Sequence, residues 1–371
     1  MKEDAKRSLE SLLGKKVTTD PIELITYEVD AGLNHGSPEG VAFPQSQEDV
    51  ARLVQWAVEH QVPLVARGSG TGLAGGSVPN HGGVVVSFSR MNRVLDIDEI
   101  DRLAVVEPGI INLTLDTLVK ERGYYFPPDP ASGRAAAIGG NIAINAGGPH
   151  CFKYGVTTNY VMGLDFVLAD GQVMHSGGRT SGYPEYDFTS LMCGSEGTLS
   201  IISAATLRLI HKPLGYKTMI ATFDSVETAG EAVSAVISAG LVPASLEMMD
   251  KILIGIIEDY AHAGFPTDAA ALLLAEVDGY PEGLESQIEE IVQTMEKKGA
   301  LELRVFQTPA EREKIWNARK SAFGAMARIS PAYFQVDGTV PRARLAETLA
   351  DINQMCAELG LRVGYVFHAG D

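Results

Sequence analysis

The glycine-rich segment at 67–77 has the composition of a loop that holds a phosphate group. It reads Arg-Gly-Ser-Gly-Thr-Gly-Leu-Ala-Gly-Gly-Ser and follows a short apolar run at 62–66, which predicts a buried strand. Glycine permits positive φ angles and lets backbone N–H groups approach phosphate oxygens. One arginine and three hydroxyl groups accompany the glycines. The segment therefore predicts a pyrophosphate-binding loop, with the amides of Gly68–Gly72 and the Ser77 hydroxyl as its donors.

Three other interpretations of this loop are weaker. Its glycines also match the spacing of the Rossmann dinucleotide fingerprint, but that fingerprint needs a helix to begin inside the loop. Here the loop continues into a turn at 78–83 and a strand at 84–88, so a Rossmann NAD enzyme is a remote alternative. A Walker A loop would need a lysine where Gly76 stands. A plain surface turn is disfavoured by so much glycine between two strands.

Two later motifs join the loop in a recognisable order. The segment at 127–148 contains Ile-Gly-Gly-Asn-Ile-Ala-Ile-Asn-Ala-Gly-Gly, and 194–202 reads Gly-Ser-Glu-Gly-Thr-Leu-Ser-Ile-Ile. The set resembles the vanillyl-alcohol oxidase family of flavoproteins. Short runs of the second half resemble its FAD-linked D-2-hydroxyacid dehydrogenase branch, and most of all the flavoprotein subunits of bacterial glycolate oxidases. These runs lie at 246–250, 328–331, 337–341 and 368–371.

The resemblance implies an α+β fold with three parts. An N-terminal segment at 1–38 precedes a two-subdomain FAD-binding domain of the p-cresol methylhydroxylase (PCMH) type at 39–213. A ferredoxin-like antiparallel-sheet cap domain, incomplete at its C-terminal end, follows at 214–371.

Sequence patterns predict the elements that would position these motifs. In the first half we expect a helix opened by Ser46, with Asp49 in a capping-box-like position, a helix at 112–123, a hairpin at 163–174 and a strand at 198–210. After a linker at 211–215, strands alternate with amphipathic helices, which we expect on one face of a sheet. The strands are expected at 216–223, 243–249, 270–278, 301–307, 332–336 and 362–368, and the helices at 225–239, 250–262, 283–298, 309–328 and 342–359.

The resemblance extends the FAD contacts beyond the first loop, because small residues let the backbone reach the flavin ring and its ribityl chain. Relatives that bind flavin covalently carry a histidine at the position of Thr71, so noncovalent FAD is expected here. The expected FAD-binding residues are Arg67, Gly68, Ser69, Gly70, Thr71, Gly72, Ser77, Pro130, Ser132, Gly139, Gly140, Asn141, Ala143, Asn145, Gly147, Glu196, Gly197 and Ile202.

Arg319 is the candidate for binding a substrate carboxylate. In related dehydrogenases an arginine at this place holds that group, and a guanidinium offers a suitable fork of donors. On the sequence alone, a solvent-facing arginine on an amphipathic helix is an equal alternative. Some relatives add a lysine at the position of Gln335, so that contact is in doubt here.

His368 is the second candidate catalytic residue. In the family pattern it begins a run that supplies two imidazoles to a divalent metal (Zn, Mn or Fe), and a later Glu-His pair adds a ligand and a base. The sequence stops at Asp371, inside that run. A lone imidazole is usually structural or solvated. The expectation is therefore that chain 1–371 binds FAD but oxidises hydroxy acids poorly.

Composition sets outer limits on function. The chain has 371 residues and a formal net charge of −17, which argues against nonspecific binding to nucleic acid. We see no secretory signal and no apolar run long enough to span a membrane. Three widely spaced cysteines cannot hold an iron–sulfur cluster between them. We expect a cytoplasmic location, or a peripheral one at the inner membrane through partners.

The expected function is FAD-dependent oxidation of a 2-hydroxy acid, glycolate or D-lactate, to the 2-oxo acid. The electron acceptor would be an iron–sulfur or second flavin-type subunit, or a quinone. Alternatives are a D-lactate or D-2-hydroxyglutarate dehydrogenase, and a flavin-binding subunit that is catalytically silent.

Overall fold

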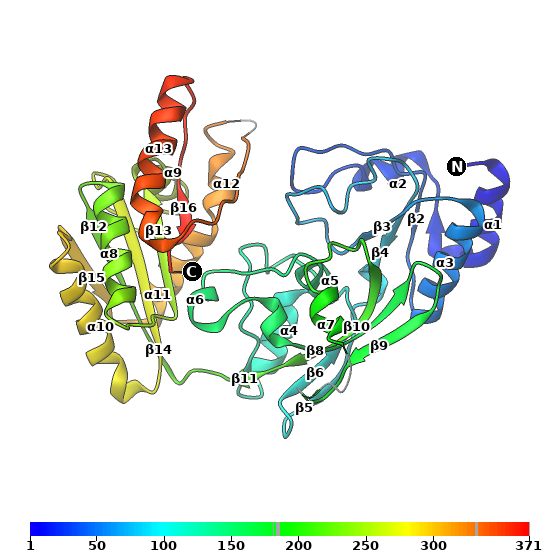
Figure 1. Ribbon diagram of the computed structural model, residues 1–371, viewed down its shortest axis with the longest axis horizontal. Helices are drawn as coiled ribbons and strands as arrows, with labels where there is room; N and C mark the ends of the chain where they lie inside the picture. Colours follow the sequence, from blue (N-terminus) through cyan, green and yellow to red (C-terminus); the bar gives the residue numbers. More distant parts are fainter. Residues whose placement is uncertain (181, 183–185, 331–332, 371) are drawn as a thin grey trace. The chain divides into compact units, whose positions relative to one another are not determined.

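The computed structural model describes residues 1–180, 182, 186–330 and 333–370 (Figure 1). The chain forms two compact units. Unit 1 comprises Met1–Gly147 and Val156–Lys212, and unit 2 comprises Gly148–Gly155 and Pro213–Asp371. The short segment Gly148–Gly155 thus interrupts unit 1 and belongs to unit 2. In the described part of the chain, no helix has the length and apolar character needed to cross a membrane.

The first subdomain of unit 1 is a four-stranded sheet in the order β1-β2-β4-β3, in which β2, β4 and β3 run parallel. Helices α1 and α3 cover it and share its apolar core. The Ser46 hydroxyl accepts the Asp49 N–H at the start of α3, as expected, but the Asp49 carboxylate accepts from Gln45 and Lys16 instead of closing a capping box. The elements are α1 Glu3–Leu13, β1 Val17–Thr18, α2 Pro21–Leu24, β2 Gly40–Ala42, α3 Gln47–His60, β3 Leu64–Arg67 and β4 Val84–Ser87.

The second subdomain is a five-stranded antiparallel sheet in the order β5-β6-β10-β8-β9. The predicted hairpin is β8–β9, which turns at Asp170-Gly171, where Gly171 has φ +83°. A two-stranded sheet, β7–β11, includes His211, the first residue of the expected linker at 211–215. The elements are β5 Val94–Asp98, β6 Leu103–Val106, α4 Asn112–Lys120, β7 Tyr124–Tyr125, α5 Ile138–Ala143, β8 Val161–Leu168, β9 Val173–Gly177, α7 Phe188–Met192, β10 Ser200–Arg208 and β11 Ile210–His211.

Unit 2 is built on an antiparallel sheet in the order β15-β12-β14-β13-β16. Its first four strands in chain order have the 4-1-3-2 arrangement of a ferredoxin-like fold. The elements are α6 Cys151–Tyr154, β12 Gly215–Phe223, α8 Val226–Ser238, β13 Ser245–Asp250, α9 Lys251–Ala261, β14 Ala271–Gly279, α10 Pro281–Glu296, β15 Glu302–Phe306, α11 Pro309–Lys320, α12 Ala322–Met326, α13 Leu345–Glu358 and β16 Val366–His368.

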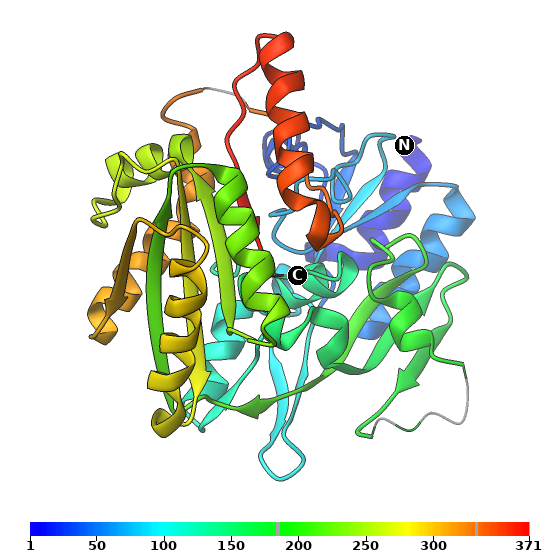
Figure 2. The same ribbon diagram turned by 60° about the vertical axis from the view of Figure 1, so that its left-hand side comes forward.

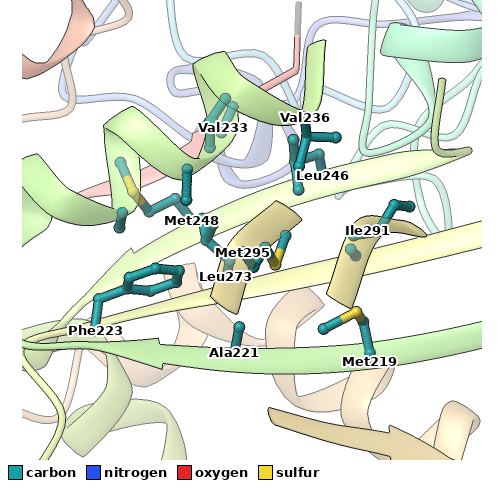
Figure 3. Close-up of a cluster of buried hydrophobic side chains, with 14 of the residues drawn as sticks. Met219, Ala221, Phe223, Val233, Val236, Leu246, Met248, Leu273, Ile291 and Met295 are labelled. Carbon is teal, nitrogen blue, oxygen red and sulfur yellow. The ribbon is translucent and has the colours of Figure 1, made fainter. Parts of the chain in front are cut away.

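Helices cover both faces of the unit 2 sheet, so the expectation of helices on one face is wrong. Helices α8 and α10 lie across one face (Figure 2), where Val233, Val236 and Met295 meet Met219 and other strand residues (Figure 3). Side chains of α9, α11 and α12 pack with strand residues such as Ile220 in a second core. Since neighbouring strand residues point to opposite faces, Met219 packs into the first core and Ile220 into the second.

Two further boundaries differ from expectation. The helix expected at 309–328 is divided at Ser321 into α11 and α12. No strand forms at 333–336, and residue 332, where that strand was expected to begin, lies outside the described residues. The expected domain limits at 38/39 and 213/214 stay predictions.

Candidate functional site

A pocket in unit 1 brings the three sequence motifs together. It encloses about 450 Å³, open solvent at its mouth included. The first motif contributes Arg67 and Gly68 at the end of β3, and α5 contributes the second. The lining is Ala66, Arg67, Gly68, Phe88, Pro108, Gly139, Gly140, Ala143, Ser195, Gly197, Ser200 and Ile202.

Seven of the expected FAD-binding residues line this pocket: Arg67, Gly68, Gly139, Gly140, Ala143, Gly197 and Ile202. The others lie outside its lining: Ser69, Gly70, Thr71, Gly72, Ser77, Pro130, Ser132, Asn141, Asn145, Gly147 and Glu196. Sequence reasoning missed Ala66, Phe88, Pro108, Ser195 and Ser200. Ser195 and Ser200 fall inside the third motif, whereas Phe88 and Pro108 carry no local signal of cofactor binding.

The first loop has backbone amides that could bind an anion. Among the described residues, none accepts a hydrogen bond from the amides of Ser69, Gly70, Thr71 or Gly72. Gly70 has φ +69°, a conformation that favours glycine. Four consecutive N–H groups that no described residue accepts are available to hydrogen-bond a phosphate group.

The second and third motifs hold one another in place. Glu196 donates its N–H to the Ala143 carbonyl at 2.8 Å, and Gly194 donates to Ile142 at 2.9 Å. Asn145 and Glu196 have φ values of 50° and 53°, which non-glycine residues rarely adopt. Such strained residues cluster at binding sites, where the surrounding structure maintains them.

The residues present fit a bound FAD. The side-chain Nδ2 of Asn141 is buried and donates to no described residue, so it is an unsatisfied donor at the second motif. A side chain at Gly139 would approach Pro108 to 2.6 Å, and one at Gly68 would approach Ala137 to 3.0 Å, so glycine keeps both backbones close. The motif at 130–136 is a compact turn in which the Ser132 carbonyl accepts the amides of Ala135 and Ala136.

The two candidate catalytic residues of unit 2 meet on a third residue, Glu247 of β13. Arg319 of α11 forms a buried ion pair with Glu247 Oε2, and His368 Nδ1 lies 2.8 Å from Glu247 Oε1. Arg319 is 4% exposed and Glu247 is fully buried. Glu247 lies in the run at 246–250 that carries the family resemblance, but no role was predicted for it, although a carboxylate in a buried strand is a recognisable signal.

The described residues do not form a metal site. Within these residues, no three histidine, cysteine, aspartate or glutamate side chains gather closely enough to hold a metal ion. His368 as a metal ligand therefore stays a prediction. Gln335 lies in an irregular segment, where its Nε2 donates to Asp337 at 3.4 Å.

Two buried carboxylates of β14 bind the segment Gly148–Gly155. Glu276 accepts from Arg312 through Nε and Nη2 at 2.7 and 2.6 Å, from Trp316 at 2.7 Å, and faces His150 at 3.5 Å. Burial favours the neutral form, but the hydrogen bonds from His150 and Arg312 outweigh it and lower the pKa of Glu276 to about 2. Asp278 accepts the Tyr154 hydroxyl at 2.6 Å and pairs with Lys153.

This fold and site define an FAD-binding oxidoreductase, and comparisons with known proteins agree. Residues 38–177 match the profile of the FAD binding domain, and 213–371 match that of the FAD linked oxidases, C-terminal domain. The chain is 40% identical to glycolate oxidase subunit GlcD of Escherichia coli (strain K12) over 98% of this chain and 73% of GlcD. It is 32% identical to D-lactate dehydrogenase of Anaerostipes hadrus, over 97% of this chain and 76% of that enzyme.

A solved structure shows the same fold. The 4-ethylphenol oxidase from Gulosibacter chungangensis superposes with a TM-score of 0.80 over 99% of this chain and 80% of its own, at 20% identity. The chain belongs to the FAD-linked oxidase family with a PCMH-type FAD-binding domain, and its cofactor is FAD.

Proposed function

We propose that the protein is a dehydrogenase that oxidises a small 2-hydroxy acid to the 2-oxo acid, with glycolate as the first candidate and D-lactate as the second. The observation that carries the proposal is the convergence of Arg319 and His368 on Glu247. A 2-hydroxy acid presents a carboxylate and a hydroxyl group on adjacent carbons. Glu247 holds a guanidinium and an imidazole. The guanidinium is suited to bind the substrate carboxylate, and the imidazole is suited to take the proton of the hydroxyl group.

Arg319 is the proposed carboxylate-binding residue. Its Nε is buried and donates to no described residue, so the guanidinium keeps a donor that Glu247 does not use. Glu247 orients the guanidinium and balances its charge in the absence of substrate.

His368 itself is the proposed acceptor of the substrate's hydroxyl proton, a role that the family resemblance gives to a later Glu-His pair. When Glu247 accepts from Nδ1–H, the Nε2 atom of the neutral ring becomes the proton acceptor. Oxidation removes a hydride from the carbon and a proton from the hydroxyl. FAD, when bound, supplies the acceptor for the hydride and its two electrons.

The proposal includes a partner and a location. The E. coli relative is named as a subunit of glycolate oxidase, which supports transfer of electrons to a partner subunit, iron–sulfur or flavin-type, or to a quinone. We place the protein in the cytoplasm or at the inner membrane through that partner. FAD is held noncovalently, because the Thr71 hydroxyl is not a nucleophile toward the flavin methyl group.

Anaerobic flavin reduction tests the activity. The purified protein, expressed from its complete gene, is mixed with glycolate, D-lactate or D-2-hydroxyglutarate, and the visible flavin absorbance is followed. Bleaching by glycolate or D-lactate is expected. Bound FAD that none of the three acids reduces would contradict the proposal and favour a catalytically silent subunit.

Arg319→Met tests the carboxylate contact. We expect kcat/KM to fall by the equivalent of roughly 2–5 kcal/mol, because a buried charged contact is lost. Lys314→Met on the same helix is the matched control, since Lys314 is exposed. Equal kcat/KM values for the two variants would assign Arg319 a purely structural role.

A further inference from the structure

The N-terminal segment Tyr27–Asn34 lies against the glycine-rich loop of the FAD site. The Asp30 carboxylate accepts the Gly32 amide at 2.7 Å with Oδ1 and the Gly75 amide at 3.0 Å with Oδ2. Ala31 donates its N–H to the Gly72 carbonyl at 3.1 Å. This segment precedes residue 38, where the match to the FAD-binding profile begins. The shape of the loop therefore depends on residues that the family match does not include.

Tyr27 of the same segment supports Arg67, which is a buried cation without an ion-pair partner among the described residues. Arg67 is 8% exposed, and its Cζ lies 5.6 Å from the centre of the Tyr27 ring. Its Nη1 donates to the Ser77 carbonyl at 3.3 Å. Burial lowers the pKa of Arg67, and the charge of Asp30 opposes that effect. A buried charge without a direct ion pair is costly, and an anionic ligand would relieve that cost.

Arg67 also lies beside the loop amides. A Cβ atom at Gly70 would approach Arg67 Nη2 to 2.2 Å, so the guanidinium occupies the space that a side chain would fill. The amides of Ser69–Gly72 donate to no described residue. Arg67 is the only charged residue in the lining of the pocket, as far as the described residues show. A chain with a net charge of −17 thus places one cation beside four available amides.

We propose that Tyr27, Asp30 and Arg67 complete the pyrophosphate site for FAD. Arg67 binds a phosphate oxygen directly, while Tyr27 and Asp30 are positioning residues that hold the guanidinium and the loop in place. The inference rests on the proposed function, and it assigns to the N-terminal segment a part in cofactor binding.

Ligands with and without phosphate test Arg67. Apoprotein is titrated with FAD and with riboflavin, and Kd is measured by quenching of flavin fluorescence. Arg67→Met should weaken FAD binding roughly 10- to 100-fold, the usual effect of losing a hydrogen bond to a charged group, and leave riboflavin binding unchanged. Arg67→Lys, which keeps the charge, should fall between. Arg90→Met is the control, because Arg90 is an exposed arginine 4.9 Å over the Phe43 ring.

The outcomes separate this inference from the proposed function. Unchanged FAD affinity in Arg67→Met, or equal losses for FAD and riboflavin, would overturn the phosphate contact. Failure of the unmodified protein to bind FAD would overturn the proposed function itself.

Asp30→Ala tests positioning, because two effects predict opposite signs. Removing a negative charge near Arg67 would by itself tighten FAD binding. Releasing the Gly75 and Gly32 amides would loosen the loop and weaken FAD binding. Weaker FAD binding with unchanged riboflavin binding is expected. Tighter FAD binding would overturn the positioning role of Asp30.

Discussion

At the scale of single residues, Glu276 is a buried anion held by several donors. Besides Arg312 and Trp316, the Thr218 hydroxyl donates to it at 2.5 Å. Its position in β14, within the run Ala-Leu-Leu-Leu-Ala-Glu-Val, is visible in the sequence, since a carboxylate there breaks an apolar strand. The residues that donate hydrogen bonds to Glu276 were not predictable, because they come from β12, α11 and the distant segment Gly148–Gly155.

Glu276→Ala should destabilise unit 2 by roughly 3–5 kcal/mol, because it leaves the buried side of Arg312 without its anion. Glu302→Ala, at an exposed position of β15, should change the free energy of unfolding by less than about 0.5 kcal/mol. Urea denaturation of both variants provides the measurement. Similar midpoints for the two variants would show that the Glu276 contacts contribute little.

Glu276 should also give unit 2 an acid-sensitive stability. Its folded-state pKa of about 2 lies below the ordinary glutamate value of 4.5, so its contribution is complete above pH 4.5 and is lost as pH falls toward 2. The contribution at neutral pH is on the order of 3 kcal/mol. Unfolding free energies of Glu276→Gln, measured across pH 2–5, should show a flatter acid limb than those of the unmodified protein. An identical slope would contradict the low pKa.

At the scale of elements, helix α6 is a one-turn helix fixed by its side chains. Lys153 donates to the Asp278 carbonyl at 3.0 Å, and Tyr154 donates to the Asp278 carboxylate. So short a helix has no stability of its own, because nucleation is unfavourable. Its position must come from these contacts with β14.

Tyr154→Phe should therefore lower the stability of unit 2 by about 1.5–3 kcal/mol, the cost of a hydrogen bond to a charged acceptor. Tyr280→Phe is the matched control, since Tyr280 is 76% exposed. Chemical denaturation would measure both, and faster proteolysis within 148–155 should accompany the loss. A Tyr154→Phe variant as stable as the control would mean that the Lys153 contacts suffice.

Most elements of both units were predictable, because their signals are local. Strands β12 and β13 and helices α8 and α9 follow the periodicity of their apolar residues, and in the structure Ser225 and Asp250 cap the two helices. The two-faced packing was missed although 271–275 reads Ala-Leu-Leu-Leu-Ala, a continuous apolar run typical of a strand covered on both faces, and the structure buries every residue of Ala271–Asp278. The break at Ser321 and the Arg67–Tyr27 contact depend on tertiary structure, which no local pattern encodes.

At the scale of the whole molecule, all residues that line the proposed FAD pocket belong to unit 1, and each unit has its own apolar core. A ligand that binds only the native state stabilises the unit that holds it, by about 2.7 kcal/mol at a concentration 100 times Kd. Calorimetry with excess FAD should shift one of two thermal transitions upward and leave the other in place. A single transition that moves as a whole would show that the units unfold together.

Because the segment Gly148–Gly155 belongs to unit 2, it limits where the gene of this protein could recombine with the gene of a relative. A recombination point at 213/214, the domain limit expected from the sequence, would separate Glu276 and Asp278 from His150, Lys153 and Tyr154. In such a hybrid, the two carboxylates would come from one protein and the residues that donate hydrogen bonds to them from another. A buried carboxylate that loses its donors is costly. The unit that would have to be exchanged intact is thus discontinuous in the gene: the eight residues Gly148–Gly155 must be replaced together with the segment that begins at Pro213.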